Sequence, residues 1–444
     1  MAGADAGVRA GDRHQHSTVA TRRLGCGARL RARIHRGARE IDASCVEVEH
    51  EGARLILDVG LPLDSPSDAD VPLHAVPGLA EGDHALLGVI VSHSHPDHYG
   101  LISGVHESIP IFIGQAAQRI LGEATFFGAP GVVLNAAGHL RDGVPFELGP
   151  FRLTPLLVDH SAFDAYAVLV EAGGRRMLYS GDIRAHGRSS ELFEGLVSSA
   201  PSHVDALLLE GTHVRDVETQ AERGPSETEL EDDLVGLMSR TPGMVLACYS
   251  AQNIDRLITF HRAARQAGRL LVLDLYGAYI ASATGDDSIP QAGHDGVRVF
   301  VPQSQRVRVK RAAAFERTAR VKPHRLFREQ LATRSTELVM TFRGSMAPEL
   351  ESAGCLDGAA AVWSMWHGYL NRPIGQKLRR WCDSNGIPMC TMHSSGHASV
   401  RDLQRLATAI AATQVVPIHT SAPQRFAELF SEVTVREDGE WWNV

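Results

Sequence analysis

The 444-residue sequence predicts an α/β protein that folds into more than one lobe. The chain is longer than one hydrophobic core usually serves, so two or three lobes are expected. Short apolar runs rich in Leu, Val and Ile, bounded by Gly or Pro, are typical of buried strands and recur in the first half and near the end. Between residues 211 and 390, helix patterns alternate with strand patterns, as they do in an α/β lobe.

Six of the predicted strands end abruptly at a charged residue or a histidine. They are ARLILDVG (53–60), ALLGVIVSHSH (85–95), FRLTPLLVDH (151–160), RRMLYSGD (175–182), DALLLEGTH (205–213) and TQVVPIHT (413–420). In α/β sheets the ligand crevice forms at the carboxyl ends of the strands. We therefore expect seven polar residues to converge on one sheet edge: Asp58, His93, His95, His160, Asp182, Glu210 and His419.

The region from 211 to 390 predicts a second α/β lobe. Residues 226–241 form an amphipathic pattern that begins with Ser226 and Glu229 at the spacing of a capping box. A second helical pattern, 251–268, ends at a glycine, as helices often do. Three further strands are expected in RLLVLDLYG (269–277), TELVMTF (336–342) and AAVWSMW (360–366).

Composition limits the class of protein. A net charge of −8 argues against a globally basic nucleic-acid-binding protein, although it does not exclude a local basic patch. The six cysteines contain no CxxC pair, so we expect neither a disulfide framework nor a cysteine-based zinc site. A reducing cytoplasm is therefore the expected location.

Residues 1–22 are small, polar and basic, which indicates a disordered tail rather than a secretion signal. Without an apolar run of about 18 residues, no membrane span or membrane partner is expected.

The segment VSHSHPDHYG, residues 91–100, carries the strongest chemical signal. It places three histidines and an aspartate within six positions. In an extended turn, His93 and His95 point the same way and can reach one ion. Pro96 prevents simple helical continuation, so that Asp97 and His98 can face a second position. Imidazole and carboxylate ligands suit Zn²⁺, with Mn²⁺ as an alternative where oxygen ligands predominate.

Four ligands in one loop do not complete two metal ions. The natural completing groups are His160, Asp182 and His419, each at a predicted strand end. Two divalent ions against two carboxylates and a bridging hydroxide leave a positive site. Such a site favours an anionic substrate, and two ions can stabilise both the attacking and the leaving oxygen of a phosphoryl displacement.

These motifs resemble the metallo-β-lactamase fold superfamily: HxHxDH at 93–98, LILDVG upstream, and VDH and YSGD downstream. LLLEGTH (207–213), HSSGHAS (393–399) and VPIHT (416–420) resemble motifs A, B and C of the β-CASP nucleases, which include ribonuclease J. The resemblance implies an αββα sandwich with an inserted α/β domain. It divides the chain into a tail (1–22), the first part of the sandwich (23–212), a β-CASP domain (213–390) and the last part of the sandwich (391–444).

The resemblance also implies a role for each matching residue. His93, His95 and His160 would hold one zinc ion, Asp97, His98 and His419 the other, and Asp182 would be shared. Asp58 would hold a ligand histidine in the right tautomer, a role that general physical reasoning also expects. His397 would donate a proton to the leaving 3′ oxygen, oriented by Glu210, while a hydroxide activated by two metal ions attacks. His393, Ser395 and Gly396 match the part of ribonuclease J that contacts substrate phosphate.

The histidine at motif C accompanies RNA-processing members of the β-CASP group, so RNA is the expected partner, with single-stranded DNA as an alternative. Two features depart from ribonuclease J. Thr420 stands where a small residue is usual, and the chain ends 25 residues beyond His419, so we expect the usual C-terminal domain to be missing. Exonuclease and endonuclease action both stay open, as does a homodimer.

Other functions compete with an RNA nuclease. A lactamase-fold hydrolase of a small ester, thioester or lactam would share the metal motifs but would not need the 211–390 lobe, Glu210 or His397. A nucleic-acid-binding scaffold with a lapsed active site is disfavoured, because every candidate ligand is present. The stretch 306–328 holds nine Lys or Arg against one Glu. It is either a phosphate-binding patch or a solvated helix face.

Overall fold

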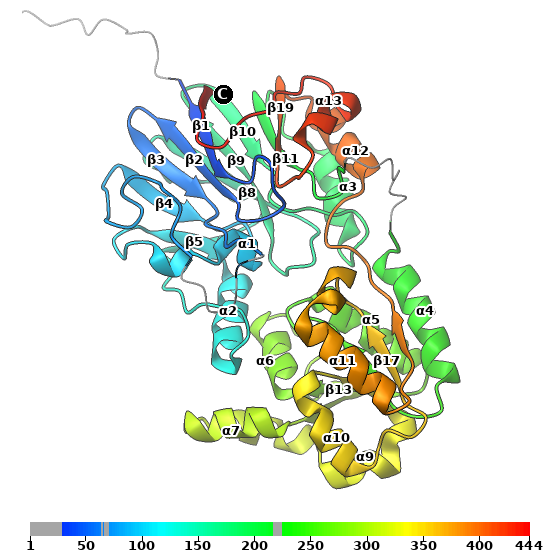
Figure 1. The fold of residues 1–444 in the computed structure, drawn as a ribbon. Helices are drawn as coiled ribbons and strands as arrows, with labels where there is room; N and C mark the ends of the chain where they lie inside the picture. Colours follow the sequence, from blue (N-terminus) through cyan, green and yellow to red (C-terminus); the bar gives the residue numbers. More distant parts are fainter. Residues whose placement is uncertain (1–28, 64, 66–70, 216–223) are drawn as a thin grey trace, which may run out of the picture.

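The computed structural model describes residues 29–63, 65, 71–215 and 224–444, which form three β-sheets with helices around them (Figure 1). The predicted tail, residues 1–22, lies outside the described residues. Two sheets form the upper lobe in Figure 1, and the third forms the lower lobe. None of the described helices is both long enough and apolar enough to cross a bilayer.

The upper lobe is a sandwich of two sheets. In spatial order, the first sheet contains β20 (Trp441–Asn443), β1 (Arg31–Arg36), β2 (Cys45–His50), β3 (Ala53–Leu57), β4 (Leu86–Ile90), β5 (Ile111–Gly114) and β6 (Gly138–Leu140). The second contains β19 (Gln414–Ile418), β11 (Ala206–Glu210), β10 (Arg175–Tyr179), β9 (Tyr166–Ala172), β8 (Phe151–Leu157) and β7 (Phe146–Leu148).

One apolar cluster lies between these sheets and joins residues such as Val46 and Leu57 of the first to Val168 and Leu208 of the second. The outer face of the first sheet carries α1 (Pro96–Tyr99) and α2 (Gln115–Phe127), and that of the second carries α3 (Ser190–Ser198), α12 (Val400–Ile410) and α13 (Phe426–Leu429). The layers are therefore helix, sheet, sheet and helix, which confirms the predicted αββα sandwich.

The third sheet is wholly parallel. Its spatial order is β15 (Arg325–Leu326), β14 (Val297–Phe300), β13 (Leu270–Asp274), β16 (Leu338–Thr341), β12 (Val245–Cys248), β17 (Ala360–Trp363) and β18 (Met389–Thr391). One face packs on α4 (Glu227–Arg240), α5 (Ile254–Gln266) and α6 (Leu275–Ala283), and the other on α9 (Arg328–Arg334), α10 (Ala347–Ala353) and α11 (Pro373–Ser384). The helices α7 (Gln303–Arg311) and α8 (Glu316–Val321) lie between β14 and β15 in the chain.

The predicted helices and strands agree closely with the structure. The capping box of α4 is formed by Ser226 and Glu229, as the sequence pattern indicates. One difference lies in RLLVLDLYG, where the strand stops at Asp274 and α6 begins at the next residue. The side chain of Asp274 accepts a hydrogen bond from the backbone N–H of Gly277, so it caps the new helix and ends the strand.

The two lobes contact each other through α2 and α6. Ile120 and Ala124 of α2 belong to the same apolar cluster as Ala281 of α6. Arg119 donates hydrogen bonds of 2.7 Å to the carbonyls of Ala283 and Thr284 at the end of α6. The sandwich and the third sheet therefore share a packed interface.

Candidate metal centre

The polar ends of six strands meet at one edge of the sandwich, as expected. Strands β8, β10, β11 and β19 run in the same direction, because β10, β11 and β19 pair in parallel and β8 is related to β10 through two antiparallel pairings. Their carboxyl ends lead into His160, Asp182, Glu210 and His419, respectively. From the other sheet, the ends of β3 and β4 lead into Asp58 and the HxHxDH loop.

The structure places seven of these side chains in two compact groups, each able to hold a cation. Within each group the potential ligand atoms all lie within 4.8 Å of one another. The first group is His93, His95, His160 and Asp182, and the second is Asp97, His98, Asp182 and His419. Asp182 belongs to both groups, in the position where a shared carboxylate could join two ions.

The HxHxDH loop folds by simple local rules. Pro96 begins the one-turn helix α1, where a proline is favoured because its missing N–H is not needed. Pro96 was expected to prevent helical continuation, but it is instead the first residue of a short helix. Gly60 crosses the end of this turn so closely that a Cβ atom there would lie 1.8 Å from the carbonyl oxygen of Asp97. The backbone N–H of Leu61 bonds to the Pro96 carbonyl at 2.9 Å, which ties the two loops together.

Asp182 lies at the centre of the cluster. Its Oδ2 is 3.6 Å from His93 Nε2 and 3.3 Å from His98 Nε2. The same oxygen is 3.9 Å from Nε2 of both His160 and His419. The Nε2 atoms of His93, His98 and His419 therefore face a common space without a hydrogen-bond partner among the described residues, whereas His160 Nε2 lies 3.0 Å from His95 Nδ1.

Several buried polar atoms around this space have no hydrogen-bond partner among the described residues. They are both carboxylate oxygens of Asp182 and Nε2 of His93, His98 and His419. A buried polar atom without a partner is costly, so the cluster is incomplete without another group. Nitrogen and oxygen donors in this arrangement fit a divalent metal ion.

The protonation states of His93, His95 and Asp182 fit a cation, whereas Asp182 and Asp58 outweigh burial at His98 and raise its pKa well above the usual value. Burial, with the neighbouring His98 and His160, holds the pKa of His93 well below its usual range, and burial lowers the pKa of His95 to about 4. Burial alone would raise the pKa of Asp182, but His419 and His98 hold it well below its ordinary value. A neutral imidazole and an ionised carboxylate are the forms that bind metals.

Asp58 supports the second group from behind. It is fully buried, and its Oδ2 accepts hydrogen bonds from His98 Nδ1, Ser92 Oγ and the Tyr179 hydroxyl, each 2.7 Å long. The Nδ1 proton of His98 is thereby fixed, and its Nε2 is turned toward the cluster. Asp58 has φ of 62° and His419 has φ of 52°, and both are left-handed conformations that non-glycine residues seldom adopt.

Two other candidate ligands are oriented by partners that the sequence analysis did not identify. His419 Nδ1 lies 3.0 Å from the Ser44 hydroxyl, and His160 Nδ1 lies 2.6 Å from the carbonyl oxygen of Gly396. A Cβ at Gly396 would lie 2.5 Å from Ser161 Oγ, so only glycine brings this carbonyl to His160 without displacing a neighbour. Gly396 therefore contacts the cluster through its backbone.

His397 and Glu210 form an acid–base pair beside the cluster. His397 Nδ1 is 3.3 Å from Glu210 Oε1 and 3.8 Å from Asp182 Oδ2. Burial lowers the pKa of His397, but Glu210 and Asp182 outweigh it and raise the pKa to about 9. Glu210 is fully buried and accepts a hydrogen bond from the Thr212 N–H, which fixes the carboxylate.

The loop that carries His397 is held by residues without an assigned role in the sequence analysis. His213 Nδ1 donates to the carbonyl of Ala398, so its Nε2 accepts from the Ser395 hydroxyl at 3.1 Å. Ser395 in turn accepts from the His397 N–H. His213 is part of the LLLEGTH motif, so the sequence could have indicated it as a candidate site residue. Its partners, however, are about 180 positions away in the chain.

The three residues expected to contact substrate phosphate lie in this same loop, between β18 and α12. Ser395 and Gly396 make the contacts just described. His393 Nδ1 lies 3.4 Å from Arg256 Nη1, and burial with the charge of Arg256 lowers its pKa to about 4. The structure thus groups them beside His397, while their role toward a substrate stays a prediction.

Comparison with known proteins agrees with this geometry. Residues 65–261 match the family described as the β-lactamase superfamily domain. Ribonuclease J of Mycobacterium tuberculosis (strain H37Rv) is 27% identical over 253 residues, which cover 54% of this chain and 43% of that protein. Ribonuclease J of Thermus thermophilus is 26% identical over 242 residues, covering 49% and 40% of the two chains. The match to the RNase J-like protein of Methanocaldococcus jannaschii is 21% over 256 residues, covering 55% and 57%.

The chain spans less than two thirds of the length of these relatives. A crystal structure of a protein of unknown function from Enterococcus faecalis V583 covers 94% of this chain and all of its own, with a TM-score of 0.74 and 18% identity. That likeness concerns the fold and extends over both lobes. The chain therefore carries a metallo-β-lactamase-fold domain and is a homologue of ribonuclease J over about half of its length, consistent with a ribonuclease J-like protein of the β-CASP group.

Proposed function

We propose that this protein is a zinc-dependent nuclease that hydrolyses RNA phosphodiester bonds. The observation that carries the proposal is the pair of four-residue groups that share Asp182, with unpartnered buried nitrogens and oxygens facing the space between them. The names of the ribonuclease J relatives support RNA as the substrate.

Two zinc ions would be held by the two groups: His93, His95 and His160 would hold one, Asp97, His98 and His419 would hold the other, and Asp182 would serve both. Mn²⁺ is the alternative metal. When bound, such ions acidify water and neutralise charge that develops on a phosphate.

The chain's own residues would complete the reaction. The oxygen of water forms a bond to phosphorus, and the bond from phosphorus to the 3′ oxygen breaks, leaving a 5′ phosphate and a 3′ hydroxyl. His397 Nδ1 faces Glu210 and Asp182, which leaves Nε2 to give its proton to the departing 3′ oxygen. Glu210 orients the ring during this transfer. The side chain of His397 is 20% exposed, so a substrate can reach it.

The test is cleavage of one end-labelled oligonucleotide in RNA and DNA versions, each with a 5′ monophosphate or a 5′ hydroxyl. Zinc-loaded wild type should cut RNA, and Asp97→Ala should abolish cutting while the fold is retained. Release of mononucleotides would identify an exonuclease, and internal fragments an endonuclease. Normal turnover by the Asp97 variant would contradict the two-ion site. Two bound metals without cleavage of either polymer would favour hydrolysis of a small molecule instead.

A further inference from the structure

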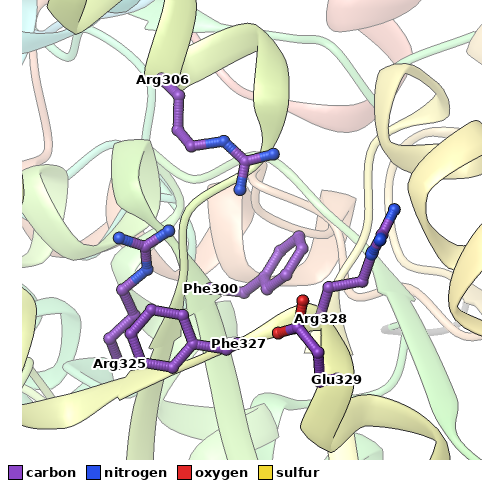
Figure 2. Close-up of a pocket in the computed structure, with 6 residues that line it drawn as sticks. All are labelled: Phe300, Arg306, Arg325, Phe327, Arg328 and Glu329. Atoms are coloured by element: carbon purple, nitrogen blue, oxygen red, sulfur yellow. The ribbon is translucent and has the colours of Figure 1, made fainter.

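A cavity of about 310 Å³ lies in the lower lobe, apart from the metal centre. Figure 2 shows arginine side chains and phenylalanine rings around it. Its lining residues are Phe300, Arg306, Arg325, Phe327, Arg328 and Glu329, which we call the arginine pocket. In Figure 1, α7 and α9, which border it, lie at the bottom of the view, whereas α1 of the metal centre lies in the upper lobe.

The position of the pocket in the third sheet is typical of a ligand site. Phe300 is the last residue of β14, and Phe327 directly follows β15. The pocket therefore opens at the carboxyl ends of two neighbouring parallel strands, where α/β sheets bind their ligands. Its volume is at the lower end of the range for small-molecule sites, about 300 to 1,000 Å³.

The pocket holds positive charge that the protein only partly neutralises. Arg306 pairs with Glu349 at 2.6 Å. Arg325 has no carboxylate within ion-pair distance among the described residues, and its Nε is buried without a hydrogen-bond partner. Burial, with the nearby charge of Arg306, lowers the pKa of Arg325 although Glu329 opposes this. An incoming anion would offset the repulsion between the guanidinium groups of Arg325 and Arg306.

The aromatic rings add a flat apolar surface. The guanidinium of Arg325 lies 4.7 Å from the centre of the Phe327 ring, which holds the arginine in place. Phe327 is still 46% exposed, whereas Phe300 is buried and forms the floor. An anion-binding guanidinium beside an open aromatic ring matches a phosphate linked to a planar base.

We propose that the arginine pocket binds one nucleotide of a single-stranded RNA, with the phosphate at Arg325 and Arg306 and the base against Phe327. This inference rests on the proposed function, because the RNA would be the substrate held at the metal centre. The pocket would anchor a part of the strand distant from the scissile bond, and so raise affinity without taking part in the chemistry. Other arginines of the basic stretch have structural tasks, such as Arg317, which forms an ion pair with Glu123 of α2.

The experiment compares Arg325→Gln with Arg311→Gln, which removes the same charge from an exposed residue of the same basic stretch outside the pocket. The dissociation constant of a 5′-phosphorylated RNA 20-mer is measured by fluorescence anisotropy at several salt concentrations, in an Asp97→Ala background that prevents cleavage. Arg325→Gln should weaken binding about tenfold and reduce the salt slope by about one, and Phe327→Ala should weaken it without changing the slope. Arg311→Gln should change affinity by less than about twofold.

In the protein with Asp97 restored, Arg325→Gln should raise KM for the RNA 20-mer and leave kcat unchanged. Arg325→Lys keeps the charge but loses the two-pronged contact, so it should give an intermediate affinity and shows that the site is folded. If Arg325→Gln binds and cleaves RNA as well as the wild type does, the pocket assignment is overturned and the proposed function is unaffected. If the zinc-loaded wild type cuts no RNA, the proposed function itself is contradicted. If AMP binds in an Arg325-dependent way while RNA affinity is unchanged, the ligand is a free nucleotide and not the strand.

Discussion

Asp58 supports the candidate metal centre although it belongs to neither of the two groups that could hold a cation. Its carboxylate collects three hydrogen bonds from side chains and one from the Ser92 N–H, all in a fully buried position. Asparagine tolerates the left-handed backbone that Asp58 adopts. Asp58→Asn therefore removes the negative charge while keeping the left-handed backbone conformation. The variant thus separates the electrostatic support of His98 from the effect of backbone strain.

We expect Asp58→Asn to lower zinc affinity by about 10- to 100-fold, as is usual when the partner of a ligand histidine is changed. The measurement is competition for zinc against a chelator of known affinity, followed in parallel by circular dichroism. Tyr179→Phe is the matched control, because it removes one donor to the same carboxylate and leaves the His98 contact intact. Equal zinc affinity in Asp58→Asn and wild type would show that Asp58 does not support the site.

His397 gives a second test at a single position. His397→Ala should retain its metal, since the residue belongs to neither four-residue group, and should lower kcat for RNA cleavage by about 10² to 10⁴. Metal content is read by mass spectrometry of the purified protein and kcat by single-turnover cleavage. Loss of zinc from this variant would make His397 a ligand rather than a proton donor.

At the level of elements, the loops after β3 and β4 must pack against each other for the HxHxDH residues to be in place. Gly60 is the contact point, because a Cβ there would overlap the carbonyl of Asp97. Gly60→Ala should therefore displace α1, lower the melting temperature and weaken metal binding. Gly122→Ala is the control: its Cβ would meet nothing within 4 Å in the middle of α2, and the change should stabilise the helix by about 1 kcal/mol. Unaltered metal binding by Gly60→Ala would show that the close packing at Gly60 is not needed to position the HxHxDH residues.

The strands and the grouping of the candidate ligand residues were predictable because they depend on local patterns. Each apolar run forms a strand whose end carries a polar residue, and the HxHxDH spacing places four donors in one turn. The supporting contacts were not predictable in the same way. Ser44 reaches His419 across 375 positions and Arg184 reaches the carbonyl of Ser395 across 211, so only the packing of the whole chain brings them together.

At the scale of the whole molecule, a buried network of charges connects the sandwich to the third-sheet lobe. Arg184 of the sandwich is fully buried and lies 3.0 Å from Asp159 and 3.6 Å from Glu227, which begins α4. Glu227 also binds Arg256 of α5 at 2.9 Å. Arg256 and Arg184 then donate to the carbonyls of Ser394 and Ser395, in the loop that carries His397. The relative placement of the lobes and the position of His397 thus depend on one set of ion pairs.

Removing one member of this network should be costly, because the remaining charges stay buried. Glu227→Gln is expected to destabilise the protein by about 3 to 5 kcal/mol at neutral pH, the usual effect of breaking a buried pair. Glu194→Gln, which breaks an ion pair with Arg405 on the exposed surface, should cost less than about 1 kcal/mol and serves as the control. Chemical denaturation at pH 7 measures both differences, and equal costs for the two variants would show that the buried network contributes no more than a surface pair.

The same network predicts how stability responds to acid. Burial would raise the pKa of Glu227, but Arg256 and its hydrogen bonds lower the pKa to about 2 from the ordinary 4.5. A carboxyl whose pKa is lower in the folded than in the unfolded chain stabilises the fold fully above the unfolded value and loses that contribution as pH falls toward the folded one. The stability gap between wild type and Glu227→Gln should therefore be constant above pH 5 and narrow progressively between pH 4.5 and pH 2. Chemical denaturation of both proteins across this pH range measures the difference in stability. Both proteins are first stripped of metal, so that loss of zinc cannot differ between them. A difference that stays constant down to pH 3 would mean that Glu227 is not held ionised by its arginine partners.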